Sequence, residues 1–331
     1  MLLVVALLLA QDKPADRGDV AIRKGIAFLV STQDKDGAIA DLPRNQTAMT
    51  SLAILALAAV GHQPTDETPE GQAMKKALAY VLRADRQDSQ GYLGGADKSR
   101  MYGHGIITLM LSEMLGMGVD VQMDQLIRER CRSAIQLILR SQAQPKESRH
   151  QGGWRYLPDA KDSDLSVTVW QVMALRSARN AGMEVPKESI DSAVGYIKRC
   201  YKPENLKGAC GYEPGRRPEY ATAATGLLAL QVCGEYDSPE AQGSANWLKE
   251  KKLEIASEWF FYGTYYYAQG MFHRGGEHAL AVEETLLPNQ GPDGSWQGRR
   301  GQDRDAGKIY GTSLAILSLA VKFHFLPIYQ R

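Results

Sequence analysis

Two kinds of apolar pattern alternate along this chain. Six segments carry few charges on any face and are rich in Ala, Gly, Thr and Leu. They are residues 47–61, 103–116, 164–178, 220–234, 261–272 and 310–321. A helix that is apolar all round has to be buried on all sides. We therefore expect these six segments to form an inner set of helices.

The segments between them are amphipathic, and each has a charged face. They are residues 19–31, 71–84, 126–140, 189–200, 238–252 and 277–287. The alternation repeats about every 50 residues, and strand-like alternation is absent. The pattern predicts an all-α fold, a single (α/α)6 toroid with two concentric layers of six helices. An open solenoid is the alternative, but its end repeats should carry polar capping faces, and residues 310–321 are as apolar as residues 47–61.

The turns after most outer segments share a Gly followed by an apolar or aromatic residue. They read QDKDGAI from Gln33, RQDSQGYL from Arg86, QGGW from Gln151, GACGYE from Gly208 and QGPDGSW from Gln290. Glycine permits the left-handed turn that ends a helix. We expect the glutamine amides to bond backbone groups that are left exposed at a helix end.

The last of these turns, Gln290 to Trp296, reads Gln-x-x-x-Gly-x-Trp and resembles the Gln-Trp repeat of squalene–hopene and oxidosqualene cyclases. The alternating helices and Gly-aromatic turns make the chain similar to the wider α/α-toroid superfamily of terpenoid cyclases and protein prenyltransferases. The resemblance covers residues 19–326. It implies a fold rather than one activity, because this toroid carries several unrelated functions.

An acidic stretch opens the third inner segment. Residues 162–166, Asp-Ser-Asp-Leu-Ser, are similar to the Asp-x-Asp-Asp-Thr motif of class II terpene cyclases, whose middle Asp protonates an alkene or epoxide. The resemblance gives Asp164 the acid position and Asp162 the position of the first aspartate. Leu165 stands where the family has its third aspartate. Cyclases of this family generally use two toroids, and this chain has length for one.

A simpler role for Asp164 is to cap a helix. Asp is a preferred N-cap, and the helix dipole favours its negative charge. Asn45 and Asp305 precede other inner segments in a similar way, where no catalysis is indicated. The two roles make different demands, since an acid needs a cavity and a cap needs only backbone amides.

A cyclase also needs aromatic faces that stabilise cations in a central cavity. Candidates for lining such a cavity lie near the starts of inner segments or in turns: Trp154, Tyr156, Tyr102, His104, Tyr212, Tyr220, Tyr266, Trp296 and Tyr310. The alternative is that the rings fill the centre of the toroid as core.

Two other toroid chemistries are disfavoured by the residues. Protein prenyltransferases bind zinc through an Asp-x-Cys pair, and no Asp stands two residues before a cysteine here. The thioester of complement-type toroids needs Cys-Gly-Glu-Gln, but this chain has Cys-Gly-Glu-Tyr from Cys233 to Tyr236. The sequence therefore predicts no metal site and no cofactor.

Carbohydrate-active toroids remain an alternative, because they need two carboxylates across a groove. Asp164, Glu213, Glu219 and Asp305 are candidates for such a pair. A third alternative is a non-catalytic toroid that binds an apolar ligand or a protein partner. The cyclase resemblance implies an isoprenoid or another small molecule in the central cavity and peripheral contact with a membrane, and it identifies no protein partner.

The net charge and the N-terminal residues bear on the partners and the location of the protein. The formal net charge is +1, and no dense basic cluster occurs, which argues against a nucleic-acid partner. Residues 1–10, MLLVVALLLA, resemble the apolar region of a secretory signal peptide. We expect residues 11–18 to be a linker and residues 19–331 to be the toroid domain. The protein is then exported to the periplasm or the medium, and without a signal peptide it is cytoplasmic.

Overall fold

The computed structural model describes residues 16–204, 207–272 and 274–330. The expected signal peptide, residues 1–10, lies outside the described residues. The first helix begins at Arg17, within the segment that the sequence assigned to a linker. The toroid therefore starts slightly before the expected boundary.

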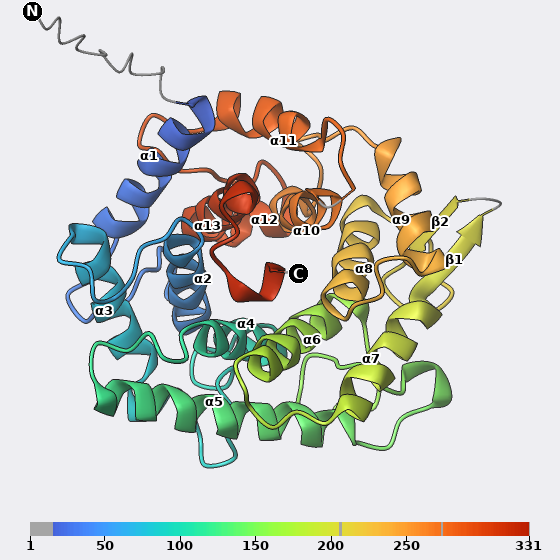
Figure 1. Ribbon diagram of the computed structural model, residues 1–331, viewed down its shortest axis with the longest axis horizontal. Helices are drawn as coiled ribbons and strands as arrows, with labels where there is room; N and C mark the ends of the chain where they lie inside the picture. Colours follow the sequence, from blue (N-terminus) through green and yellow to red (C-terminus); the bar gives the residue numbers. More distant parts are fainter. Residues whose placement is uncertain (1–15, 205–206, 273, 331) are drawn as a thin grey trace, which may run out of the picture.

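In the described part of the chain, six outer helices surround six inner helices (Figure 1). The outer helices are α1 (Arg17–Ser31), α3 (Pro69–Val81), α5 (Val121–Gln142), α7 (Lys187–Cys200), α9 (Pro239–Lys249) and α11 (His278–Leu286). The inner helices are α2 (Gln46–Ala58), α4 (Arg100–Glu113), α6 (Leu165–Asn180), α8 (Tyr220–Val232), α10 (Phe260–Phe272) and α13 (Gly307–Leu319). In α2, every residue after Gln46 is buried, as expected for a helix without a charged face.

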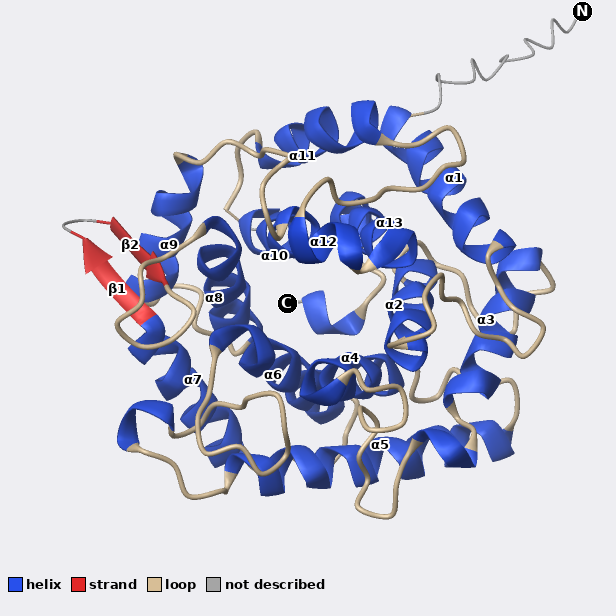
Figure 2. Cartoon of the chain, turned by 180° about the vertical axis from the view of Figure 1, so that it is seen from behind, coloured by secondary structure: helices blue, strands red, loops and turns tan. Residues whose placement is uncertain are grey.

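The ring of inner helices is closed. Each inner helix contacts the next one along the chain, and α13 contacts α2 (Figure 2). An open solenoid would leave these two helices apart. The predicted all-α toroid is therefore confirmed.

The remaining elements are short. A two-stranded antiparallel hairpin, β1 (Tyr201–Glu204) and β2 (Lys207–Cys210), lies at the outer layer between α7 and α8 along the chain. Helix α12 (Gly301–Asp305) precedes α13. The 3-10 turns are η1 (Ala84–Arg86), η2 (Ser148–His150), η3 (Leu287–Asn289), η4 (Ala320–Phe323) and η5 (Pro327–Tyr329).

Four glutamines join neighbouring outer helices. Each side-chain amide donates one hydrogen bond to the glycine carbonyl of its own turn and one to a carbonyl of the next outer helix. The glutamines and their two acceptors are Gln33 with Gly37 and Ala73, Gln87 with Gly91 and Arg130, Gln142 with Gly152 and Ser189, and Gln290 with Gly294 and Ala21. The bond from Gln290 to Ala21 links the turn after α11 to α1 and so closes the outer layer.

This arrangement corrects one sequence assignment and explains the turn glycines. In the third turn the bonding glutamine is Gln142, not Gln151, because an insertion separates it from Gly152. Gly294 has a φ of +84°, and a Cβ there would lie 2.4 Å from the carbonyl oxygen of Lys24. A side chain would therefore push the turn away from the helix to which it is bonded.

The C-terminal segment fills the middle of the ring (Figure 1). The Tyr329 hydroxyl bonds the Tyr265 hydroxyl, and the Ile328 amide donates to Glu113 Oε2 at 3.4 Å. Glu113 ends α4, so this segment lies toward the C-terminal ends of the inner helices. Burial raises the pKa of Glu113 to about 7, although hydrogen bonds from Ser177 and Ile328 favour its charged form.

All four cysteines are free thiols. Across the residues that the structure describes, no helix is long and apolar enough to cross a bilayer. In the same residues, no group of three or more His, Cys, Asp or Glu side chains is arranged to hold a metal ion.

Candidate functional site

The N-termini of the inner helices meet at the end of the ring opposite the C-terminal segment. Asp164 is the N-cap of α6, and its Oδ1 accepts hydrogen bonds from the Val167 amide at 2.8 Å and the Ser166 hydroxyl at 2.9 Å. Its side chain has no solvent exposure. Burial raises the pKa of Asp164 to about 6, and the bonds from Val167 and Ser166 and the charge of Arg155 oppose this rise. Asp164 thus combines a capping role with an unusually high proton affinity.

Arg155 connects Asp164 to two further carboxylates. Its Nε lies 3.2 Å from Asp164 Oδ2. Its Nη1 lies 2.5 Å from Glu213 Oε1 and 3.4 Å from Asp162 Oδ2. Asp162 is about half exposed and faces Arg155 rather than Asp164. One guanidinium therefore holds three carboxylates that come from two separate loops.

Tyrosines surround this guanidinium. Arg155 lies 5.0 Å from the ring centre of Tyr156 and 5.5 Å from that of Tyr212, and the hydroxyls of these two tyrosines bond each other at 2.5 Å. Tyr102 stacks on Tyr156 and donates to Ser166 Oγ at 2.8 Å. We call Arg155 with Tyr102, Tyr156 and Tyr212 the arginine–tyrosine cluster. All four residues are partly exposed.

Backbone bonds fix the loops that carry this cluster. The Tyr156 carbonyl accepts from the amide of Met101, near the start of α4, and the Tyr212 carbonyl accepts from the amide of Leu165, at the start of α6. Each loop thus satisfies an amide that the first turn of an inner helix leaves free. The cluster therefore sits on rigid supports.

Aromatic residues continue from the cluster into the centre. The Tyr262 hydroxyl donates to the Ser166 carbonyl at 2.9 Å, and its ring lies 4.8 Å from that of Tyr266. Tyr266 also contacts Trp170 and Tyr265, which are buried and stacked on each other. The deep part of the ring is therefore packed with aromatic side chains.

The other candidate residues from the sequence lie in different places. Tyr310 is partly exposed as a residue and lies near Tyr262. Its hydroxyl is removed from water, and this burial raises the pKa of Tyr310 well above its usual value. Tyr220 packs on Tyr267 and bonds Thr264, away from the arginine–tyrosine cluster. Trp154, Trp296 and His104 are buried between the layers, where they bond carbonyls of outer helices: Trp154 to Ile138, Trp296 to Leu286 and His104 to Ala134. Burial also lowers the pKa of His104 to about 4.

Two residues near the N-terminal ends of the inner helices, Arg155 and Trp259, were not predicted from the sequence. Arg155 follows Trp154 in a polar loop, and its position beside a Gly-Gly-Trp turn gave no local signal. Trp259 is 38% exposed, has a φ of +60° and lies 6.2 Å from the Tyr262 ring. Such a left-handed backbone is uncommon for a bulky residue and is concentrated at functional sites. This strain was not readable from the sequence.

Carboxylates cap several inner helices, and Asp164 is one of them. Asp97 accepts from the Ala48 amide of α2, Asp303 from Phe261 of α10, and Asp41 from Lys308 of α13. In these three cases the cap comes from another part of the chain. Asn45 makes no side-chain cap bond to α2, and for α13 the cap is Asp41 rather than Asp305. Asp164 differs from these caps by its direct contact with Arg155.

Replacing Asp164 with asparagine should change the free energy of unfolding at pH 8 by no more than about 1 kcal/mol, because asparagine caps a helix nearly as well. The folded protein holds the Asp164 proton up to about pH 6, whereas the unfolded chain releases it near 3.8. Wild-type stability should therefore fall as the pH rises through this range, and Asp164→Asn should lack that contribution.

Urea unfolding of both proteins from pH 4 to pH 8 measures this difference. Comparison of the two curves is needed because burial also raises the pKa of Asp303 to about 6. Parallel curves at all pH values would show that Asp164 is not the titrating group that its burial implies.

No family model matches the chain, and no curated protein sequence matches it. Solved structures do match. The cellobiose 2-epimerase from Bacillus thermoamylovorans has a TM-score of 0.64 at 12% identity, covering 91% of this chain and 98% of the epimerase. A variant of the type II terpene cyclase MstE from Scytonema, bound to geranylgeranyl dihydroxybenzoate, has a TM-score of 0.60 at 16% identity, covering 94% and 98%.

A third match is an inactive variant of an α-1,6-mannanase of a Salegentibacter species, bound to α-1,6-mannotetrose. It has a TM-score of 0.60 at 12% identity, covering 94% of this chain and 100% of the mannanase. This chain covers 98% of MstE, so the length of a single toroid does not by itself rule out a type II terpene cyclase. At these identities the matches show a shared fold. The chain is an α/α-toroid protein, with the architecture found in a terpene cyclase, a mannanase and a sugar epimerase.

Proposed function

We propose that the protein is a carbohydrate-active α/α toroid whose ligand binds at the arginine–tyrosine cluster. The observation that carries this proposal is the single guanidinium held among three carboxylates and flanked by two tyrosine rings. Sugars present apolar C–H faces and polar hydroxyl edges. Tyrosine rings match the faces, and a guanidinium with its carboxylates matches the edges.

Asp162 and Glu213 supply the reactive pair in this proposal. Both carboxylates reach the same nitrogen of Arg155. Their contacting oxygens therefore lie no more than about 6 Å apart, an upper limit that is compatible with the roughly 5–5.5 Å separation of the carboxyl pair in retaining glycosidases. Both side chains have exposed surface, whereas Asp164 has none. Asp164 is then a positioning residue, whose buried carboxylate holds the Arg155 guanidinium in place.

Fold and setting support this choice. A mannanase and a cellobiose 2-epimerase share the toroid architecture. Export, which the apolar run at residues 1–10 predicts, would bring the protein into contact with extracellular polysaccharide. Isoprenoid substrates, by contrast, are made inside the cell and stay in membranes.

The test is to measure binding and turnover of α-1,6-mannooligosaccharides and cello-oligosaccharides by calorimetry and product chromatography. Glu213→Gln should lower turnover about 100-fold or more, as expected for loss of a catalytic acid or base. The matched control is Glu235→Gln, since Glu235 pairs with Lys198 at 2.7 Å and is similarly half-buried. Equal activity of Glu213→Gln and wild type would contradict the proposal.

Isoprenoid cyclisation is the second candidate, with Asp164 as the acid. Its support is the raised pKa of Asp164 together with the aromatic residues Tyr262, Tyr266 and Trp170 behind it. Incubation with squalene and shorter polyprenyl substrates tests it. A cyclic product that Asp164→Asn no longer forms would replace the carbohydrate proposal. Sugar binding without turnover would instead favour the non-catalytic alternative.

A further inference from the structure

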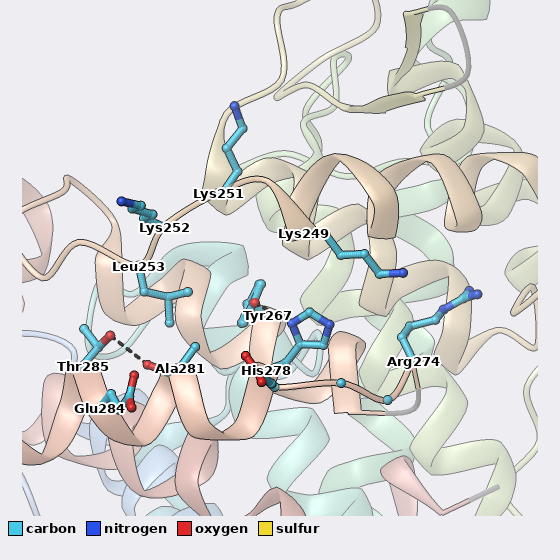
Figure 3. Close-up of a pocket in the computed structure, with 13 residues that line it drawn as sticks. Lys249, Lys251, Lys252, Leu253, Tyr267, Arg274, His278, Ala281, Glu284 and Thr285 are labelled. Atoms are coloured by element: carbon cyan, nitrogen blue, oxygen red, sulfur yellow. Dashed lines mark hydrogen bonds between the residues drawn. The ribbon is translucent and has the colours of Figure 1, made fainter.

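A cavity lies in the outer part of the toroid, away from the arginine–tyrosine cluster. It has a volume of about 580 Å³ and is bordered by the end of α9, the end of α10 and helix α11 (Figure 3). Lys249 and Arg274 lie at one end of it, and Leu253, Ala281 and Thr285 lie at the other. Cavities of this size are typical of small-molecule sites.

Four cationic side chains line this cavity, and two of them, Lys249 and Arg274, form its cationic end without an acidic partner among the described residues. Among the ion pairs of the described residues, none includes Lys249 or Arg274, although Glu277 and Glu284 line the same cavity. Lys251 and Lys252 also line the cavity, and Lys251 lies 4.0 Å from the centre of the Trp247 ring. In Figure 3 the ammonium groups of Lys251 and Lys252 point away from Arg274, whereas that of Lys249 points toward it.

Arg274 is held in place with one donor left over. One of its terminal nitrogens donates to the Tyr236 carbonyl, which fixes the guanidinium against the loop between α8 and α9. Its Nε is buried and has no hydrogen-bond partner. A buried donor without an acceptor costs free energy. Arg274 therefore has hydrogen-bonding capacity that the described residues do not use.

His278 adds a third polar group. Its Nδ1 bonds the Tyr267 hydroxyl at 2.9 Å, and both side chains line the cavity. Burial and the charge of Lys249 lower the pKa of His278, so the ring is neutral at neutral pH. When Tyr267 donates to Nδ1, the proton of the neutral ring is on Nε2, which then becomes a donor.

We propose that this cavity binds a small organic molecule through a phosphate or sulfate group, held by Lys249, Arg274 and His278. The oxyanion pairs with the Lys249 ammonium and the Arg274 guanidinium. The organic body lies against Leu253, Ala281 and Thr285. Glu284 at that end disfavours a second negative charge, so the ligand carries its charge at one end only.

Calorimetric titrations with phenyl phosphate, phenyl sulfate, phenol and inorganic phosphate test this proposal, and none of these probes is a sugar that the arginine–tyrosine cluster would bind. We expect at least one of the two esters to bind, and phenol and inorganic phosphate to bind at least about 10-fold more weakly. Tight binding of inorganic phosphate would contradict the organic part of the proposal. Absence of ester binding would overturn it.

Two matched variants locate the binding. Lys249 is exposed and makes no ion pair, so Lys249→Gln should fold normally and weaken ester binding at least about 10-fold. Lys252→Gln removes the same charge from a side chain that borders the cavity but points away from Arg274, and it should change affinity less than about 3-fold. Equal loss in both variants would indicate diffuse attraction to surface charge and would contradict a defined site.

The His278 imidazole resonance gives an independent signal. Ester binding should shift this resonance in the wild type and Lys252→Gln, because the oxyanion lies against the ring. At the same ester concentration the shift should be much smaller in Lys249→Gln. Saturable ester binding that leaves the His278 resonance unchanged would place the ligand elsewhere and sink the proposal.

Discussion

Replacing Arg155 with methionine should destabilise the protein by about 3 kcal/mol at pH 8, because it leaves the buried Asp164 carboxylate without its cation. Methionine retains much of the apolar stem of arginine, so packing changes less than charge. The same change should abolish detectable carbohydrate binding, since it removes the centre of the arginine–tyrosine cluster. Urea unfolding and calorimetry measure the two effects.

The pH dependence separates charge from packing. Without Arg155 the pKa of Asp164 should rise further above its present value of about 6. At pH 5 the carboxyl is then protonated and needs no cation, so the cost of Arg155→Met should shrink. Arg149→Met is the control, because the Arg149–Glu147 pair is exposed on both sides and should contribute little. An equal cost of Arg155→Met at both pH values would mean that packing is the cause.

Replacing Tyr329 with alanine should cost about 3 kcal/mol or more, which is the usual loss for truncating a large buried aromatic residue. Tyr329 is 9% exposed, lies in the middle of the ring and bonds the hydroxyl of Tyr265. Its removal leaves a cavity at the centre and a buried hydroxyl without a partner. Chemical denaturation of the variant measures the loss.

Two further variants show which part of Tyr329 matters. Tyr329→Phe keeps the ring and removes only the hydrogen bond, so it should cost about 1 kcal/mol. Phe325→Ala removes a neighbouring ring that is 53% exposed, and it should have a much smaller effect than Tyr329→Ala. If Tyr329→Ala were as stable as wild type, the C-terminal segment would not be part of the core.

The fold was predictable because each inner helix has to be buried on every side. Segments without a charged face identify the inner layer directly, and residues 47–61 and 310–321 predict that the ring closes. The turn from Gln290 to Trp296 was also readable, because glutamine and glycine have specific backbone roles there. Gln142 was missed because an insertion separates it from its glycine.

The site was less predictable because its parts meet only after folding. Arg155 and Glu213 are 58 residues apart, and no local pattern links them. Helix caps show the same difficulty, since α2 is capped by Asp97 rather than by the adjacent Asn45. Asp164 was found because it caps its own helix and sits in a recognisable acidic stretch. Its contact with Arg155 became visible only in three dimensions.

The fluorescence of Trp259 can report ligand binding at the proposed carbohydrate site. This tryptophan is 38% exposed beside Tyr262. Trp154, Trp170 and Trp296 are almost fully buried, and the partly buried Trp247 lies on the outer helix α9. A ligand that covers the arginine–tyrosine cluster should therefore change mainly the Trp259 fluorescence. Trp259→Phe should remove this change and leave the emission of the other four tryptophans.

Binding of mannotetraose and cellotetraose to the arginine–tyrosine cluster can be followed by tryptophan fluorescence in the wild type, Trp259→Phe and Glu213→Gln. A carbohydrate site at this cluster predicts a saturable change in the wild type with at least one of these sugars. It predicts no such change in Trp259→Phe and at least about 10-fold weaker binding in Glu213→Gln. A flat wild-type titration with both sugars, or the same affinity in Glu213→Gln, would contradict a carbohydrate site at this end of the ring.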